Sequence, residues 1–316
     1  MLTRNQNRVF DLFFQILDTP ALDPNEIKIE QLAILEEIKS IEDEGARLAG
    51  KLFNELLFEG HAYSKTIMGT LDSVKNLTAQ NLRTHFQHLK NTHPLTLSIV
   101  GKFNESLFLK HASKLPTQNR QKIEILKPHN TVPAIKSNRH AEVKKNKEQS
   151  HIFLGYLSHP IKSNNRYISK ILSTILGGQS GRLFREIRDK QGLCYTIAPT
   201  SFEGLDAGYF GIYIGTDPNK RFKAIDSIHI ELEKLCRKPV GNNELSRAKQ
   251  FLLGRHCIDL QQNASITNVI GFNNLFGLDF DEHLKLESNL RNITPKTLQN
   301  YCQELFGQHY AEVVVV

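Results

Sequence analysis

A pattern that recurs at one fixed distance constrains the fold of this chain more than any other feature. Five positions reappear 216 residues further along: a threonine, two leucines at helical spacing and two apolar residues at strand spacing. They are Thr78, Leu82, Leu89, Leu97 and Ile99, followed by Thr294, Leu298, Leu305, Val313 and Val315. In both places the order is a helix that starts at threonine, a short break and a strand. The repeat therefore favours a duplicated α+β unit.

The length of the chain agrees with two domains in series. Single cores usually stop growing near ~250–300 residues, and this chain has 316. Prolines, many lysines and weak periodicity mark residues 116–147 as a linker. We therefore predict a first domain over residues 1–115 and a second over residues 148–316. The first is the shorter, which predicts that it is incomplete at its N-terminal end.

Apolar periodicity predicts the elements of each domain. We expect helices over residues 1–17, 24–41, 48–57, 77–90, 104–115, 166–176, 220–237, 243–261 and 294–306. We expect strands over residues 95–101, 151–157, 207–216 and 311–316. The predicted fold class is α+β, with a mostly antiparallel sheet packed with helices in each domain.

Charge and cysteine usage narrow the class of protein. The net charge is +7, but the basic residues are scattered, and the densest run, Lys136 to Lys147, is expected to be a solvated linker. We therefore expect no nucleic-acid partner. The four cysteines lie far apart without a C-x-x-C pair, which argues against a disulfide framework and a cysteine zinc site.

The sequence indicates neither a membrane span nor a signal peptide. No apolar run approaches the ~18 residues of a membrane span, and the start, MLTRNQNRVFDLFFQIL, has the pattern of an amphipathic helix without the features of a signal peptide. A cytoplasmic location is favoured, with the periplasm as the alternative if a signal precedes this sequence.

The stretch GGQSGRLFREIRDKQGLCY, residues 177–195, raises the question of a phosphate loop. A phosphate loop needs a strand that runs into the glycines, and here a helical pattern precedes them. Neither of the two common glycine patterns for nucleotides is matched. We interpret Gly177 and Gly178 as the end of one helix and Ser180 as the cap of the next.

The same stretch carries a candidate binding pair. Arg182, Arg185 and Arg188 recur every third residue, and Tyr195 follows Arg188 by seven. A guanidinium and a phenol can together donate hydrogen bonds to a substrate carbonyl or to a developing oxyanion. The other interpretation of these residues is a solvated helix face and a half-buried tyrosine.

LGGQSGRLFREIRDKQGLCY resembles the C-terminal half-signature of the pitrilysin, insulinase and mitochondrial processing peptidase family, the inverted-motif zinc peptidases. EQSHIFLGYLSHP, NNELSRAKQFLLG, HAYSKTIMGTLDSVKNLTAQNLRTHF and LTLSIVGKFN resemble further parts of that family, so the likeness covers nearly the whole chain. It implies two related α+β domains of the LuxS/MPP-like type and a peptide substrate. It also implies that Arg188 and Tyr195 bind substrate and stabilise the transition state.

The metal site of that family is only partly present. Its zinc needs the two histidines and the catalytic glutamate of H-x-x-E-H, plus a glutamate further downstream. By resemblance, Glu37 is the third zinc ligand and Glu30 a carboxylate behind it, whereas alone they read as surface residues of one helix. None of the thirteen histidines belongs to H-x-x-E-H, and we expect His85 and His88 to be exposed polar positions. We therefore expect this chain not to bind zinc alone.

Two functions follow from the resemblance. The first is an insulinase-family zinc metallopeptidase homologue that acts on peptides but is inactive alone, because H-x-x-E-H is absent. The alternative is a non-catalytic subunit that supplies Arg188 and Tyr195 to a zinc-bearing relative in a homodimer or heterodimer. Whether the chain is an enzyme stays open at this point.

Overall fold

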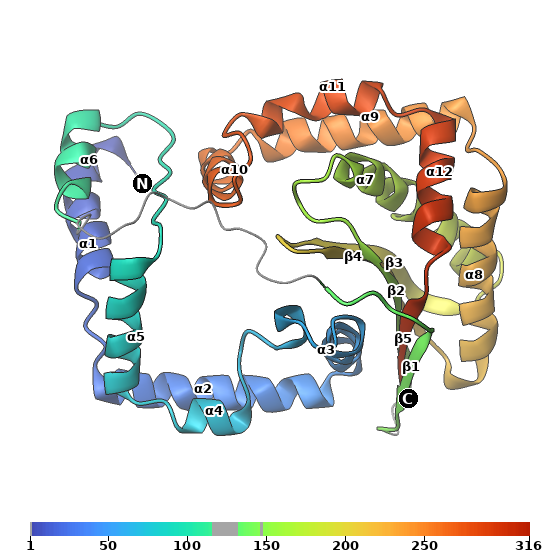
Figure 1. Cartoon of the computed structure of the whole chain (residues 1–316), viewed down its shortest axis with the longest axis horizontal. Coiled ribbons are helices and arrows are strands. Elements are labelled where there is room, and N and C mark those ends of the chain that lie inside the picture. The colour runs from blue at the N-terminus through green and yellow to red at the C-terminus, as the bar shows by residue number, and fades with distance from the viewer. Residues whose placement is uncertain (1, 116–131, 146–147) are drawn as a thin grey trace. The chain divides into compact units, whose positions relative to one another are not determined.

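The computed structural model describes residues 2–115, 132–145 and 148–316 (Figure 1). The chain divides into two compact units. The first unit comprises Met1–Ile38, Met68–Leu126 and Leu260–Phe280, and the second comprises Lys39–Ile67, Lys127–Asp259 and Asp281–Val316. The predicted domains, residues 1–115 and 148–316, were defined by a duplicated sequence pattern. The compact units are defined by contacts and do not test a duplication, so the domain division stays a prediction.

The first unit consists of helices in the residues that the structure describes. They are α1 (Gln6–Asp18), α2 (Pro24–Asp43, in this unit up to Ile38), α4 (Leu71–Lys75), α5 (Ala79–Thr92), α6 (Glu105–Ala112) and α10 (Asn263–Leu275). The predicted start of α2 is confirmed, because the Asp23 side chain accepts hydrogen bonds from the backbone N–H groups of Asn25 and Glu26. Among the described residues, Phe10, Phe14 and Leu115 form a small buried cluster in this unit.

The repeated helix start is confirmed in both places. Thr78 caps α5 and Thr294 caps α12 (Pro295–Phe306), and each forms a capping box with the side chain three residues later. The repeated strand forms only once, as β5 (Tyr310–Val315). The prediction of a strand over residues 95–101 is wrong, because no other strand pairs with that segment in the described part of the chain. Its alternating apolar side chains instead pack against the small core around Phe10.

The described residues of the second unit form one five-stranded sheet. Its strands are β1 (Arg139–Val143), β2 (Ser150–Ser158), β3 (Cys194–Glu203), β4 (Gly208–Thr216) and β5, in the order β1-β5-β2-β4-β3. Only β1 and β5 pair in parallel. The mostly antiparallel sheet that the sequence predicted is therefore confirmed here. β1 lies inside the range assigned to the linker, whose residues 116–131 and 146–147 lie outside the described residues.

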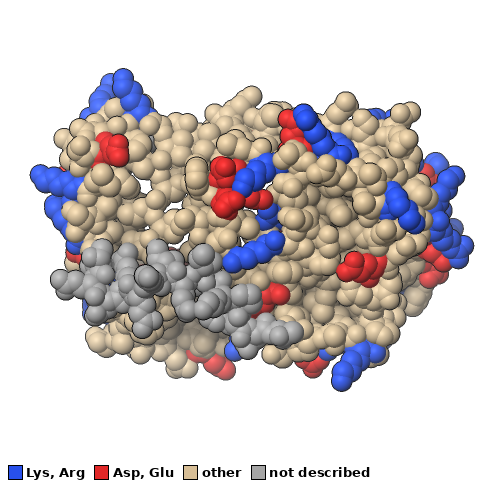
Figure 2. All heavy atoms as spheres, turned by 45° about the horizontal axis from the view of Figure 1, so that its top comes forward, with Lys and Arg blue, Asp and Glu red and all other residues tan. Residues whose placement is uncertain are grey.

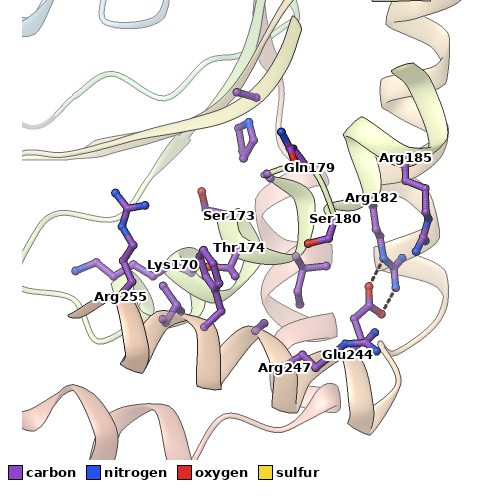
Figure 3. A pocket seen from close by; sticks show the side chains of 18 of the residues that line it. Lys170, Ser173, Thr174, Gln179, Ser180, Arg182, Arg185, Glu244, Arg247 and Arg255 are labelled. Atoms are coloured by element: carbon purple, nitrogen blue, oxygen red, sulfur yellow. Dashed lines mark hydrogen bonds and ion pairs between the residues drawn. The ribbon is translucent and has the colours of Figure 1, made fainter. Parts of the chain in front are cut away.

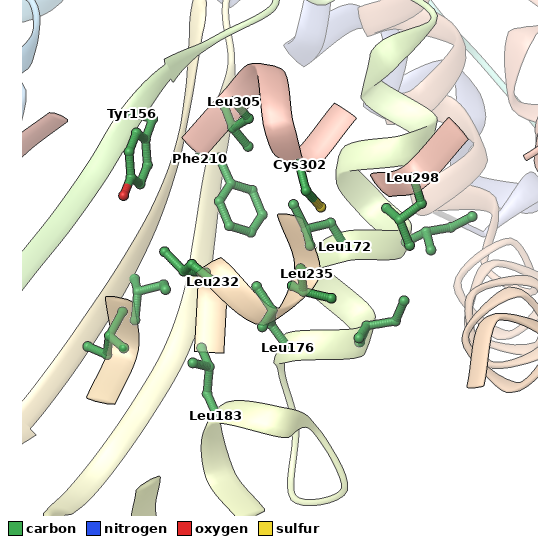
Figure 4. Close-up of a cluster of buried hydrophobic side chains, with 14 of the residues drawn as sticks. Tyr156, Leu172, Leu176, Leu183, Phe210, Leu232, Leu235, Leu298, Cys302 and Leu305 are labelled. Atoms are coloured by element: carbon green, nitrogen blue, oxygen red, sulfur yellow. The ribbon is translucent and has the colours of Figure 1, made fainter. Parts of the chain in front are cut away.

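Helices cover both faces of this sheet (Figure 1). The cores on the sheet include side chains of α3 (Gly45–Leu57), α7 (Asn165–Leu176), α8 (Arg221–Arg237) and α12, and α9 (Asn242–Asp259) and α11 (Leu286–Arg291) pack on α7. On one face, Phe210, Ile212 and Ile214 of β4 join a large core with α7, α8 and α12 (Figure 4). On the other face, α3 packs against β2, with the rings of Phe53 and Phe153 stacked 4.6 Å apart. Phe210, Ile212 and Ile214 alternate along β4 and therefore share one face of the sheet.

Candidate functional site

Arg188 lies in a π-helix, Phe184–Asp189, where the sequence pattern indicated an ordinary charged helix. The wider turn shows in the backbone, because the Lys190 N–H donates to the Arg185 carbonyl five residues earlier, at 3.1 Å. Short π-helical turns are rare and occur frequently at functional sites. The Arg188 side chain is exposed, and its guanidinium lies 4.5 Å from the centre of the Phe184 ring.

The Arg188 charge also acts on the start of β3. Burial raises the pKa of the Cys194 thiol to about 11, and the Arg188 guanidinium opposes that rise. A positive charge has this effect only when it is close. Arg188 thus acts electrostatically on the first residue of β3, although the two residues belong to different elements.

Tyr195 occupies a β-bulge on the edge strand β3. The pairing with β4 shifts register between Cys194, opposite Thr216, and Thr196, opposite Gly215, which leaves Tyr195 as the extra residue. Bulges next to active sites often redirect a side chain. Tyr195 is 61% exposed, so the interpretation as a half-buried tyrosine is wrong.

Backbone hydrogen bonds hold the segment between the two residues. The Gly192 N–H donates to the Arg188 carbonyl at 3.0 Å, and the Leu193 N–H donates to the Ile187 carbonyl at 3.1 Å. Within the described residues, neither the Arg188 nor the Tyr195 side chain forms a hydrogen bond or an ion pair. The arrangement thus presents a guanidinium and a phenol from one fixed connection, with their donors open to a ligand.

The glycines of this stretch are architectural, as the sequence indicated. Gly177 ends α7, and Gly178 has φ +72, which favours glycine. A Cβ on Gly181 would lie 2.1 Å from the Gly177 carbonyl oxygen, so the chain passes too close for a larger residue. The predicted cap is wrong, because the Ser180 hydroxyl makes no hydrogen bond within the residues that the structure describes.

Glu30 and Glu37 both lie on α2 and both are exposed. Seven residues of α-helix place them roughly 10 Å apart along the axis. His85 and His88 are exposed on α5, as predicted. Over the described ranges, no three His, Cys, Asp or Glu side chains gather as a metal would require. The residues present therefore do not fit a zinc centre, and the roles of Glu30 and Glu37 stay predictions.

A groove beside the glycine stretch was not predicted from the sequence. It has a volume of about 1530 Å³ and lies between the end of α7, residues 177–182, β3 and α9 (Figure 3). We call it the α7–α9 groove. At one end, Arg182 binds Glu244 through two hydrogen bonds, Nε to Oε1 at 2.8 Å and Nη2 to Oε2 at 2.7 Å. The Arg182 hydrogen bond lowers the pKa of the Glu244 carboxyl.

Sequence reasoning missed this groove because its walls come from segments up to 85 residues apart, from Lys170 to Arg255. The spacing of Glu244, Arg247, Phe251 and Arg255 on one face of α9 was the available signal. Alone, that spacing is also typical of a solvated helix face. The fold shows that this face of α9 lies opposite α7 and β3 and lines the groove, so it is not simply a solvated helix face.

The lysines and arginines visible in Figure 2 are interspersed with carboxylates and do not join into one continuous patch. Nucleic-acid binding ordinarily needs such a patch or stripe. In the ranges that the structure describes, no helix combines the length and the apolar character needed to cross a membrane.

Comparisons with known proteins agree with the fold. A family profile described as "Peptidase M16 inactive domain" matches residues 76–252, which is 177 of the 316 residues. The chain is 25% identical to an uncharacterized zinc protease of Streptomyces coelicolor, over 94% of this chain and 66% of that protein. It is 24% identical to the uncharacterized zinc protease YmxG of Bacillus subtilis, over 100% of this chain and 76% of that protein.

Solved structures share the fold. A protease from Helicobacter pylori matches with a TM-score of 0.84 at 19% identity, over 99% of this chain and 76% of that chain. A peptidase M16 inactive domain from Pseudomonas fluorescens matches with 0.81 at 15% identity, over 99% and 76%. A chain of complex III2 from Candida albicans matches with 0.76 at 15% identity, over 100% and 78%.

These matches define the class of protein as a homologue of zinc peptidases with an inactive-type domain. The chain belongs to the peptidase M16 family. The resemblance to the insulinase and pitrilysin peptidases is thereby confirmed, and so is the predicted α+β class. The chain spans 66% of the length of the relative from Streptomyces coelicolor, just under two thirds.

Proposed function

We propose that this chain is the substrate-binding part of an M16 peptidase and that it is inactive without a zinc centre from a related subunit. The observation that carries the proposal is the presentation of Arg188 and Tyr195. A π-helix and a β-bulge, joined by a hydrogen-bonded connection, expose both side chains without a partner within the described residues. Ordinary helix and strand geometry would not have placed them in this way.

The chemistry of the pair suits the carbonyl groups of an extended peptide. The guanidinium offers charged donors in a planar fork and the phenol offers one neutral donor. Hydrogen bonds from charged donors are about twice as strong as neutral ones, and they strengthen further on an oxygen that gains negative charge. In this proposal, Arg188 and Tyr195 therefore fix a substrate carbonyl and stabilise the oxyanion formed from it.

In this proposal the zinc belongs to another subunit, because the described side chains of this chain do not form a set of zinc ligands. The described residues bring no group of metal ligands together, and the sequence has no H-x-x-E-H. Relatives of this chain carry the name zinc protease. We therefore infer that a related subunit with H-x-x-E-H supplies the zinc and the catalytic glutamate, while Glu37 and Glu30 retain family positions without a complete site here.

The test measures zinc content and peptide cleavage in parallel. The purified chain is expected to hold far less than one zinc per molecule and to leave a quenched fluorescent peptide intact. Cleavage is expected when a related subunit that carries H-x-x-E-H is added. Stoichiometric zinc together with cleavage by this chain alone would show that the chain is a complete peptidase. If the added subunit cleaves the peptide equally well without this chain, the chain does not act as its substrate-binding partner.

An Arg188→Ala variant links the activity to the pair. It is expected to lower turnover by the reconstituted pair of subunits while the zinc content stays unchanged, because Arg188 touches substrate and not metal. Arg237→Ala is the matched control, since Arg237 is an exposed arginine on α8. A loss of zinc from Arg188→Ala in proportion to its loss of turnover would contradict the assignment. Equal losses of turnover in Arg188→Ala and Arg237→Ala would also contradict it.

A further inference from the structure

The α7–α9 groove carries an excess of positive charge. Its cations are Lys170, Arg182, Arg185, Arg247 and Arg255, and Glu244 is its one carboxylate among the residues that the structure describes (Figure 3). Cations that converge on a concave surface without balancing carboxylates raise the local potential and attract anions. The question is how much of this charge is already neutralised within the chain.

Two of the five cations are already paired. Arg182 binds Glu244 on both carboxylate oxygens, and Arg185 lies 3.0 Å from the Glu186 carboxylate. Lys170, Arg247 and Arg255 form no ion pair among the residues that the structure describes. Arg247 adds to the positive potential at Glu244, but that carboxylate is held by Arg182. Three exposed cations around one groove thus remain available to an anionic ligand.

Size and lining favour a peptide as that ligand. The volume of about 1530 Å³ exceeds the ~300–1,000 Å³ typical of small-molecule pockets. The groove is also lined by apolar side chains that reach the surface, namely Pro199, which is partly exposed, and Phe251, which is 61% exposed. A chain of phosphates would use the cations and leave this apolar surface uncovered, whereas a peptide with acidic and apolar residues uses both.

The spacing of the cations suits carboxylates along an extended peptide. Arg247 and Arg255 are eight residues apart on α9, which is roughly 12 Å along the axis. At ~3.3 Å per residue, about four residues of an extended chain cover that distance. Carboxylates three or four positions apart can therefore contact both guanidinium groups.

The groove is continuous in sequence with the proposed binding pair. Gly177, Gly178 and Ser180 line the groove, and the same segment runs through Arg182 and Arg185 into the π-helix that holds Arg188. We propose that the α7–α9 groove binds an acidic segment of the peptide substrate and so selects acidic peptides. This inference rests on the proposed function to the extent that the ligand of this chain is a peptide.

The test compares matched peptides and matched variants by fluorescence anisotropy. One labelled peptide carries glutamates four positions apart among leucines, and a second carries glutamines in their place. The acidic peptide is expected to bind more tightly, and Arg247→Gln/Arg255→Gln should weaken it by about fivefold to tenfold, as expected for two exposed charge pairs. The glutamine peptide should be insensitive to that change.

A control removes the same charge elsewhere. Arg237→Gln/Arg291→Gln alters two exposed arginines on α8 and α11, outside the groove. It should leave the affinity for the acidic peptide unchanged, and circular dichroism should show both double variants folded. Equal weakening by both pairs would reduce the effect to net charge and overturn the inference. Equal affinity for the two peptides would overturn it as well.

Two further arms separate the remaining outcomes. A single-stranded oligonucleotide or inorganic polyphosphate that binds more tightly than the acidic peptide would assign the groove to phosphate ligands and overturn the peptide. If Arg188→Ala lowers turnover but groove variants do not alter peptide choice, only the groove inference fails. If groove variants alter acidic-peptide binding while Arg188→Ala leaves turnover unchanged, the proposed function fails and the groove inference stands.

Discussion

At the scale of single residues, Tyr195 separates binding from folding, because its ring is largely exposed and its hydroxyl has no partner within the described residues. Tyr195→Phe is expected to weaken peptide turnover by the reconstituted complex by about twofold to tenfold, the effect of one neutral hydrogen bond. The melting temperature should not change. Tyr310→Phe on β5 removes the same atom from another strand and serves as the control. A stability loss in Tyr195→Phe without an activity loss would assign Tyr195 a structural role.

Cys194 reports the position of the Arg188 guanidinium. Burial raises the pKa of this thiol to about 11, so at pH 8 little of it is thiolate, and Arg188 partly opposes the rise. Alkylation of Cys194 should therefore be slow near pH 8 and accelerate toward pH 11. Arg188→Ala removes the opposing charge, so it should raise the pKa and shift that profile to higher pH. Peptide mass spectrometry after iodoacetamide treatment measures the rate. An unchanged profile would place the guanidinium far from β3.

The residues of the pair were predictable, and their presentation was not. A spacing of seven residues between an arginine and a tyrosine is visible in the sequence. The π-turn at Arg188 and the bulge at Tyr195 each add one residue to a regular pattern. The π-turn closes with a hydrogen bond to the Arg185 carbonyl, and the bulge lies where the strand pairing shifts to Thr196 opposite Gly215. Periodicity measured at 3.6 or 2.0 residues assumes that no such residue is added.

At the scale of elements, the ion pair between Arg182 and Glu244 joins α9 to the helix that follows the glycine stretch. The pKa of Glu244 is lowered in the folded chain, first of all by the hydrogen bond from Arg182. A lowered folded pKa stabilises the fold above the unfolded pKa, and that stabilisation disappears as the pH falls through the folded value. Glu244→Gln should therefore cost about 1–3 kcal/mol at pH 7, and the cost should shrink below about pH 4.5.

Urea unfolding of wild type and Glu244→Gln between pH 3 and pH 7 measures this difference. Glu287→Gln is the control, because Glu287 pairs with Arg291 on the exposed surface of α11. Such exposed pairs contribute only about 0.3–0.5 kcal/mol. A cost for Glu244→Gln that does not vary with pH would mean that the carboxylate charge is not what stabilises the contact.

The contact of α3 with the sheet depends on a glycine in β2. A Cβ at Gly155 would lie 2.6 Å from the Phe53 ring and 2.9 Å from the Gly211 Cα, so α3 or β4 would have to shift. Gly155→Ala should destabilise the chain by about 1–3 kcal/mol, as overpacking of a core does. Gly254→Ala on α9 meets nothing within 4 Å and should stabilise by about 0.5–1 kcal/mol. Denaturation midpoints of the two variants that move in the same direction would contradict this packing.

Elements with strong apolar patterns were predictable, whereas those defined by their neighbours were not. Periodicity was sufficient for α3, α7, α8 and α12 and for β2, β4 and β5, because their buried faces dominate their sequences. β1, with the sequence RHAEV, is a polar edge strand, so its pattern is typical of a loop. Residues 95–101 have a strand pattern, but a strand also needs a pairing partner, which a pattern within one segment cannot indicate.

At the scale of the whole molecule, the two compact units differ greatly in the size of their cores. In the described residues of the first unit, the hydrophobic cluster has three buried members, Phe10, Phe14 and Leu115, and α5 has no buried residue. In the second unit, both faces of the sheet are covered, and apolar side chains of β2 and β4 on each face belong to a buried core. Hydrophobic burial is the main stabilising contribution to folding, so the units should have different local stabilities.

Hydrogen exchange tests this difference within one experiment. Amides of α5 and α6 are expected to exchange through local opening at free energies well below those of β2 and β4, and thermal unfolding should deviate from a single two-state transition. Phe14→Ala should accelerate exchange in α1 and α6 while leaving β4 protected, because Phe14 packs against Phe108 of α6. Uniform protection across both units, or equal acceleration of β4 by Phe14→Ala, would show that the chain unfolds as one cooperative body.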